Sequence, residues 1–184
     1  KKEPKKEAKA DRSIDTMFRI TLSNHTRLSD IADSKANILL SVNAIIISIA
    51  LSTLLPKLGS AKNEYLVVPT FIMLLFSVIT IIFAILSTKP KVTSGEFTKE
   101  DLRKRKVNLL FFGNFYKMNL DDYTPAVREM MEDRDYLYDS MIRDLYYLGV
   151  VLNRKYRLLS ITYQIFMVGI IVSVIAFVIS FLTS

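Results

Sequence analysis

Charged and apolar residues are segregated along the chain. Charged residues are absent from 38–55, from 66–87 and from the whole segment that follows Arg157. A helix of about 20 apolar residues spans the hydrocarbon layer of a bilayer. The pattern therefore predicts three transmembrane helices, at about 38–55, 66–87 and 158–183. The first run is the shortest and most polar, and a buried core helix is the alternative interpretation for it.

Apolar positions at helical spacing continue outside two of these runs. Before the first run they begin near Ser13, which predicts one helix from about Ser13 to Leu55. A second pattern starts at TPAV, where Thr124 can cap a helix and Pro125 suits its first position, and it leads into the third run. Each apolar stripe is narrow and needs a partner helix. We therefore predict two long helical stalks, continuous with the first and third spans, that pack together within one chain or in an oligomer.

The distribution of basic residues predicts the orientation. Of the 25 Lys and Arg residues, nine lie in 1–37, two in the loop 56–65 and 14 in 88–157. Basic flanks stay in the cytoplasm, so the N-terminus and the stalk region 88–157 are expected inside and the C-terminus outside. The fold class is thus an all-α membrane protein with three transmembrane helices and cytoplasmic stalks. The net charge of +7 suits an anionic leaflet, whereas interleaved acidic residues argue against nucleic acid as a partner.

The chain opens with KKEPKKEAKA, a low-complexity run. This composition is typical of a linker. We therefore divide the chain into a linker-like N-terminal arm, 1–12, and a single membrane module, 13–184. The arm leads to the expectation that a further domain precedes it.

Residue types that carry enzyme chemistry are scarce. The chain has no cysteine, five scattered glycines and one histidine, His25. A zinc site needs several His, Cys or carboxylate ligands, and a phosphate loop needs clustered glycines. His25 on a helix seam is more often a packed residue than a general base. The sequence therefore predicts no catalytic residue, no metal site and no cofactor-binding residue in this segment.

A polar stripe follows one face of the first predicted span. It consists of Asn37, Ser41, Ser48 and Ser52. Small polar residues let helices pack closely and bond across the contact, while in an oligomer such a face can line a gate or a pore. Both interpretations stay open. Asn43 lies off the stripe and needs a hydrogen-bond partner, for which Gln164 of the third span is a candidate.

An aromatic cluster lies between the second and third spans, in NLLFFGNFYKM (108–118). The segment before it includes a TKED capping-box pattern at 98–101, which predicts a short helix, and a basic run, RKRK. Three interpretations apply to the loop: a plug in the stalk core, an anchor at the membrane surface, or a ligand platform of rings and guanidinium groups. Its candidate residues are Arg103, Arg105, Phe111, Phe112, Gly113 and Phe115.

Three short motifs resemble a known family. ADSKANILLSVNAIIIS (32–48), NLLFFGNFYKM (108–118) and LNRKYRLLSITYQIFMVG (152–169) are similar in order and topology to the Pycsar-type transmembrane effectors of bacteria. The residues that carry the resemblance are Asp33, Lys35, Ala36 and Asn43, then Phe111, Phe112 and Gly113, and last Lys155 and Tyr156. Asp33, Lys35 and Asn43 are therefore candidate boundary and motif residues.

The resemblance implies an effector of antiphage defence in the bacterial inner membrane, which impairs membrane integrity in an abortive infection. It also implies a cyclic pyrimidine nucleotide as the signal ligand. Some relatives carry an N-terminal HD-type phosphohydrolase domain. Two other functions compete with this hypothesis: a passive oligomerising anchor for an upstream catalytic domain, and a small channel or transporter unrelated to defence. The partners expected are the lipid bilayer and further copies of the chain, which would form a homo-oligomer through the stalks.

Overall fold

All regular elements in the described part of the chain are helices. The structure is a computed structural model, and it describes residues 4–58, 61–90, 100–101, 105 and 107–183. No strand occurs among these residues. Three helices are long and apolar enough to cross a membrane, within Asp11–Lys57, Asn63–Thr88 and Arg134–Thr183. The predicted all-α membrane protein with three spans is thus confirmed, whereas the first half of the TKED pattern, 98–99, lies outside the described residues.

Helix α1, Pro4–Ile49, contains the first span and extends back into the arm predicted as a linker. Its regular hydrogen bonding ends earlier than expected, because a π-helix, Ala50–Leu54, and a 3-10 helix, Leu55–Lys57, follow. The hydroxyls of Ser52 and Thr53 both donate to the carbonyl oxygen of Ile49, at 3.2 and 2.6 Å. Hydroxyls that occupy a helix carbonyl disturb its normal bonding. The predicted helix therefore does continue past Leu55, to Lys57, but it changes from α-helical to π and 3-10 bonding after Ile49.

The second predicted helix is two helices. Helix α5, Leu120–Glu132, begins before Thr124 and holds Pro125 in its interior, so the predicted start at TPAV is wrong. Helix α6 then covers Arg134–Thr183. Asp133 between them is extended, and its carboxylate Oδ1 accepts a hydrogen bond from the Tyr136 backbone N–H at 3.1 Å. This is the bond of an N-cap residue, and it explains why one helix ends and another begins here.

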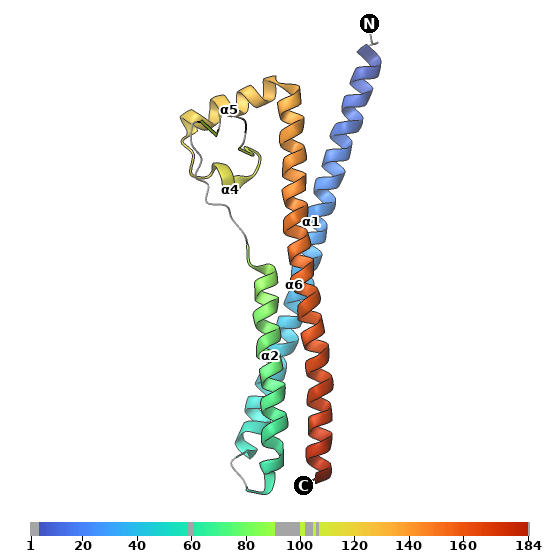
Figure 1. Cartoon of the computed structure of the whole chain (residues 1–184), viewed down its shortest axis with the longest axis vertical. Helices are drawn as coiled ribbons and strands as arrows, with labels where there is room; N and C mark the ends of the chain where they lie inside the picture. The colour runs from blue at the N-terminus through green and yellow to red at the C-terminus, as the bar shows by residue number, and fades with distance from the viewer. Residues whose placement is uncertain (1–3, 59–60, 91–99, 102–104, 106, 184) are drawn as a thin grey trace. The chain divides into compact units, whose positions relative to one another are not determined.

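The chain forms two compact units, and α1 and α6 contribute residues to both. The first unit comprises 1–28 and 90–152, with the short helix α4, Phe112–Phe115, and α5 (Figure 1). Here α1 and α6 are joined by a stack of Phe18 on Tyr138, with ring centroids 6.1 Å apart, and by an ion pair between Asp11 and Arg134. Val107, Leu109 and Met130 are buried.

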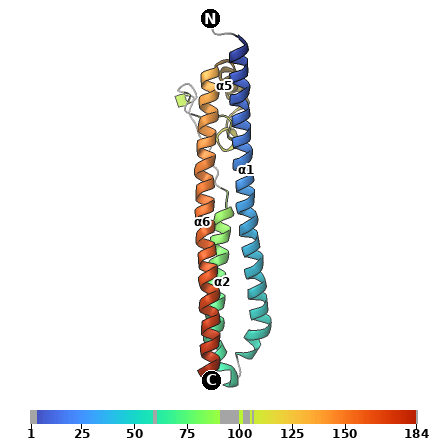
Figure 2. The ribbon, with the colours of Figure 1, turned by 90° about the vertical axis from the view of Figure 1, so that its right-hand side faces the viewer.

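The second unit comprises 29–89 and 153–184 and holds all three apolar segments. Helix α2, Val67–Thr88, lies alongside the apolar parts of α1 and α6, as the two views in Figures 1 and 2 show. Its core consists of Ala32, Ala36, Leu39, Ala84 and Leu159. Three of these five side chains are alanine, and small residues are what allow helix backbones to approach closely in membranes.

Candidate functional site

Lys155 joins α6 to α1 at the polar end of this alanine-rich core. Its ammonium group donates to both carboxylate oxygens of Asp33, at 2.9 and 2.8 Å, and to the hydroxyl of Ser29 at 2.8 Å. Ser29 and Asp33 are four residues apart, so they share a helix face and can receive the same ammonium. We call Lys155, Asp33 and Ser29 the clasp. The Lys155 side chain is only 17% exposed, so its charge depends on these partners.

The clasp fixes the register of α1 against α6, that is, their relative position along the helix axes. Ala32, Ala36 and Leu159 lie directly next to it and are buried, so sliding one helix along the other would move the ammonium away from the carboxylate and towards apolar side chains. Sequence reasoning placed Asp33 at a boundary but named no residue as its partner, and 122 residues separate it from Lys155. Lys35, the other predicted boundary residue, is exposed and does not join the clasp.

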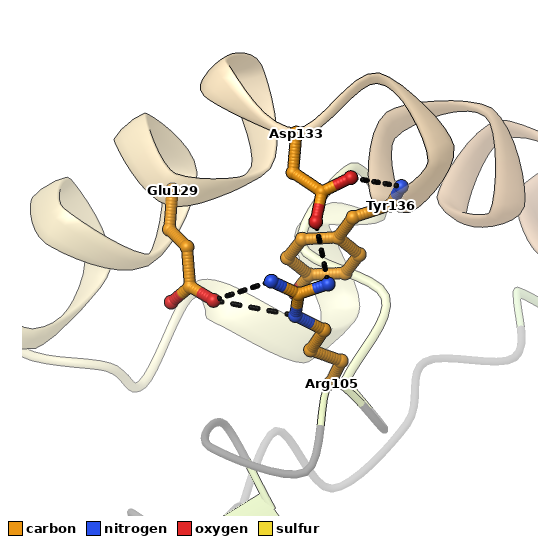
Figure 3. Close-up of polar contacts among 4 residues, drawn as sticks. All are labelled: Arg105, Glu129, Asp133 and Tyr136. Atoms are coloured by element: carbon orange, nitrogen blue, oxygen red, sulfur yellow. Dashed lines mark hydrogen bonds and ion pairs between the residues drawn. The ribbon is translucent and has the colours of Figure 1, made fainter.

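Arg105 organises a second polar cluster, in the first unit (Figure 3). Its guanidinium donates to Glu129 Oε1 from Nε at 3.2 Å and from Nη2 at 2.9 Å, and to Asp133 Oδ2 from Nη1 at 2.7 Å. The Tyr136 ring lies under the guanidinium, 4.7 Å from the centroid. The carboxylates raise the pKa of Arg105 above its ordinary value. Arg105 also has a φ of 53°, in the left-handed region that non-glycine residues seldom adopt.

Because both carboxylates already hold the Arg105 guanidinium, this side chain is not presented to an anionic ligand in the arrangement described. Arg143 reinforces the turn by donating to the Arg105 carbonyl oxygen at 2.9 Å. A phosphate would have to displace Glu129 and Asp133 to bind here. The cluster therefore orders the junction of α5 and α6, and a ligand role for Arg105 remains a prediction.

Asp133 should make this junction sensitive to acid. The Tyr136 backbone N–H and then the Arg105 guanidinium lower the pKa of Asp133. A folded-state pKa below the unfolded value of about 3.9 adds stability above that value, and the stability is lost as the pH falls through the folded pKa. We expect amide protection at the start of α6 to persist at neutral pH and to decrease below about pH 4.

Two substitutions separate the roles of Asp133 in hydrogen-exchange mass spectrometry, with rates corrected for the intrinsic effect of pH. Asp133→Asn keeps a capping oxygen but removes the charge, so it should remove the acid dependence and keep most of the protection. Asp133→Ala removes both and should lower protection several-fold at every pH. Equal protection in the two variants would show that the cap is unimportant.

The aromatic loop is held by asparagines rather than by its phenylalanines. The Asn108 side chain donates to Asp144 Oδ1 at 3.0 Å and accepts the Leu110 backbone N–H at 3.0 Å, and the Asn114 side chain donates to the Asn108 carbonyl oxygen at 2.9 Å. Both asparagines and Leu109 are buried. Sequence reasoning missed these anchors, although two amides within an apolar loop were a usable signal.

The predicted loop residues have different environments. Gly113 is buried, Phe111 and Phe115 are half-buried, and Phe112 is 56% exposed. Phe115 contacts Tyr123 of α5, with ring centroids 4.9 Å apart. Arg103 lies outside the described residues. The role of the loop as plug, anchor or ligand platform remains a prediction. Phe112 contacts the Phe111 ring, with centroids 5.1 Å apart, and is the most exposed of the predicted phenylalanines.

The polar stripe of α1 lies on the surface of the second unit. Asn37, Ser41, Ser48 and Ser52 are all exposed, and Ser41 donates to the Asn37 carbonyl oxygen at 3.0 Å. No other helix of the described chain covers this face. Asn43 is 1% exposed and points away from it, and its amide donates to the Leu39 carbonyl oxygen at 2.8 Å. The predicted pairing of Asn43 with Gln164 is wrong, because Gln164 is exposed.

Comparison with known protein families gives one match. Residues 16–181 match the Pycsar effector protein domain. The chain belongs to this family. It is thereby an effector of cyclic-nucleotide antiphage defence with three helices suited to a membrane, and the Pycsar effector domain is not a known catalytic domain. No curated protein and no solved structure matches the chain. Among the described residues, no group of three His, Cys, Asp or Glu side chains could hold a metal ion.

The ion pair of the clasp is formed by residues of the motifs that resemble the Pycsar effector family. The motifs that first suggested the family include Asp33, near the first span, and Lys155, before the third. The structure brings these two residues into one ion pair, with Nζ and Oδ2 2.8 Å apart. Among the other motif residues, Tyr156 packs against the core beside the clasp, and Gly113 is buried in the loop of the first unit.

Proposed function

We propose that this Pycsar effector domain impairs the integrity of the bacterial inner membrane when it is activated, as a homo-oligomer. The observation that carries the proposal is the exposure of the polar stripe on a helix that is apolar enough to span a bilayer. Polar side chains in a span are costly to leave against lipid, so they usually face protein or water. A second copy of the chain would cover the stripe, and separation of the copies would admit water along it.

The polar parts of α1 and α6 support an oligomer. These stalks, 11–28 of α1 and 134–152 of α6, expose large apolar side chains although they also carry many charged residues. Met17 is 53% exposed, Ile20 54%, Tyr146 68% and Val150 50%. A series of such residues on a water-facing helix indicates a protein partner. We assign the partner as a second copy, because the same apolar positions on two copies can pack against each other.

Orientation and signal complete the proposal. The excess of Lys and Arg in 1–37 and 88–157 supports a cytoplasmic N-terminus and an external C-terminus. The stalk region would then receive the signal, which the family suggests is a cyclic pyrimidine nucleotide. Phe112 and Tyr116 are 56% and 53% exposed and offer rings for a base to stack on.

Dye release from liposomes tests the proposed function. The chain is reconstituted in vesicles filled with a fluorescent dye, and release is measured with and without cyclic pyrimidine nucleotides. We expect release on addition of the active nucleotide. Vesicles that stay tight under every condition would contradict the proposal and favour a passive anchor, whereas release without nucleotide dependence would favour an unrelated channel.

Substitutions on α1 test the polar stripe in the same assay. Changing Ser41, Ser48 and Ser52 together to Leu replaces the stripe by apolar surface and should abolish release. The matched control changes Ile38, Ile45 and Ile49 to Leu, since these side chains are 60%, 58% and 56% exposed on the same helix. The control should release dye as the unchanged chain does. Equal release from both variants would exclude the stripe as a gate or a water path.

A further inference from the structure

A half-open cavity lies in the second unit, among all three apolar segments. Its volume is about 150 Å³. Most of its walls are apolar, but four polar side chains line it: Asn43 from α1, Ser77 and Thr80 from α2, and Ser173 from α6. Ser77 lies ten residues from the start of α2, which corresponds to about 15 Å along the helix axis and therefore to the middle of a bilayer.

The polar groups in this cavity have unused hydrogen-bonding capacity. Ser77 and Ser173 are 4% and 5% exposed, and neither hydroxyl has a hydrogen bond to any part of the chain that the structure describes. Asn43 uses one amide hydrogen, for the Leu39 carbonyl oxygen, which leaves a second hydrogen and the side-chain carbonyl oxygen. Thr80 differs, because its hydroxyl donates to the Phe76 carbonyl oxygen at 2.8 Å.

The unused polar groups, rather than the mostly apolar walls, argue for water in this cavity. An apolar cavity of about 150 Å³ stays dry, whereas a polar one takes up water when two to four partners are available for each molecule. A water occupies roughly 30 Å³ of liquid volume, so this cavity has room for several. Leaving the two hydroxyls without partners and the Asn43 amide only partly bonded is unfavourable, and water removes that cost.

We propose that the cavity is a hydrated site, in which water molecules join Asn43, Ser77 and Ser173 at the middle of the membrane-spanning unit. We further assign this cavity as the place from which water passes across the bilayer on activation, an assignment that rests on the proposed function. It lies on a different face of α1 from the polar stripe, since Asn43 is buried and Ser41 is exposed. The water path would thus begin inside each copy rather than between copies.

Cysteine accessibility tests the hydration without any need for activity. The chain has no native cysteine, and a thiol reacts as its thiolate, which forms readily only where water is present. Ser77→Cys and Ser173→Cys are nearly isosteric and should react with silver ions in chloride-free buffer at least about tenfold faster than Ile82→Cys, which is placed on the outer face of α2. Ser23→Cys, exposed on α1, gives the rate for a thiol in water.

Two outcomes overturn the hydrated site. One is reaction of Ser77→Cys and Ser173→Cys as slow as that of Ile82→Cys. The other comes from the unchanged chain, in which water-edited solid-state NMR should transfer magnetisation from water to the signals of Ser77 and Ser173 as fast as to exposed Ser23. Transfer no faster than to Ile82 would mean a dry cavity.

The path is tested separately by dye release. Asn43→Leu with Ser173→Val makes the lining apolar and should abolish nucleotide-dependent release. Release that persists in this variant overturns the water path. It does not decide whether the cavity is hydrated, which the thiol reaction rates test. An unchanged chain that never releases dye overturns the proposed function itself, and with it the path, but leaves the thiol rates as independent evidence for hydration.

Discussion

Changing Lys155 to Met is expected to destabilise the protein by about 1–3 kcal/mol, less than the 3–5 kcal/mol typical of a fully buried ion pair. The change leaves the Asp33 carboxylate beside the alanine core without its ammonium, and the side chain of Asp33 is 37% exposed, so water screens part of the loss. The measurement is the free energy of unfolding in mixed micelles titrated with sodium dodecyl sulfate and followed by circular dichroism.

Two variants establish that the clasp is the cause. Lys35→Met removes an equal charge from an exposed position on α1 and should change the stability by less than about 0.5 kcal/mol. Asp33→Asn added to Lys155→Met removes the unpaired carboxylate and should recover part of the loss, because an uncompensated charge is costlier than a neutral amide. A Lys155→Met variant as stable as Lys35→Met would show that the clasp contributes nothing.

Changing Gly169 to Ala is expected to push α6 away from α2 and to cost about 1–3 kcal/mol, the usual effect of overpacking. A Cβ on Gly169 would lie 2.6 Å from the Cβ of Phe76 and 2.8 Å from its Cγ. The clash is with the root of the Phe76 side chain, which no rotamer change can move. Unfolding in mixed micelles, as for the clasp, measures the loss.

A second glycine of the same helix provides the control for this prediction. A Cβ on Gly149 would meet the His25 ring at 3.6 Å, an ordinary contact. Gly149→Ala should therefore stabilise the protein by up to about 1 kcal/mol, because alanine favours a helix interior over glycine. Phe76→Gly should relieve the clash in Gly169→Ala, whereas Phe76→Ala should not, since it keeps the Cβ. Stability gains from both Gly→Ala changes would contradict the close approach of α2 and α6.

The apolar elements could be predicted from sequence because their signal is local. Residues 66–87 were expected to form a span, and α2 covers Val67–Thr88. In a bilayer, a single charge-free run of that length is stable as a helix, because a helix satisfies its backbone hydrogen bonds internally. The family could also be recognised, since Asp33 and Lys155 belong to short motifs.

What sequence reasoning missed depends on contacts between distant segments or on a single capping bond. The starts of α5 and α6 are examples. Thr124 and Pro125 resemble a helix start, but α5 begins directly after Asn119, and Asp133 caps the start of α6. The pairing of Asp33 with Lys155 is another, because nothing in either motif specifies the other. For the same reason Asn43 was assigned the wrong partner, and the cavity that it lines could not be foreseen.

The π-helix Ala50–Leu54 bears on how the family can tolerate changes in length. A π turn closes its hydrogen bond over one more residue than an α turn does, so this segment holds one residue in excess of a regular helix. A one-residue deletion there can be absorbed by restoring α-helical bonding. The same deletion between Ala36 and Asn43 would rotate all later side chains by about 100° and break the register of the alanine core. Homologous chains should therefore differ in length at the end of this span and not before it.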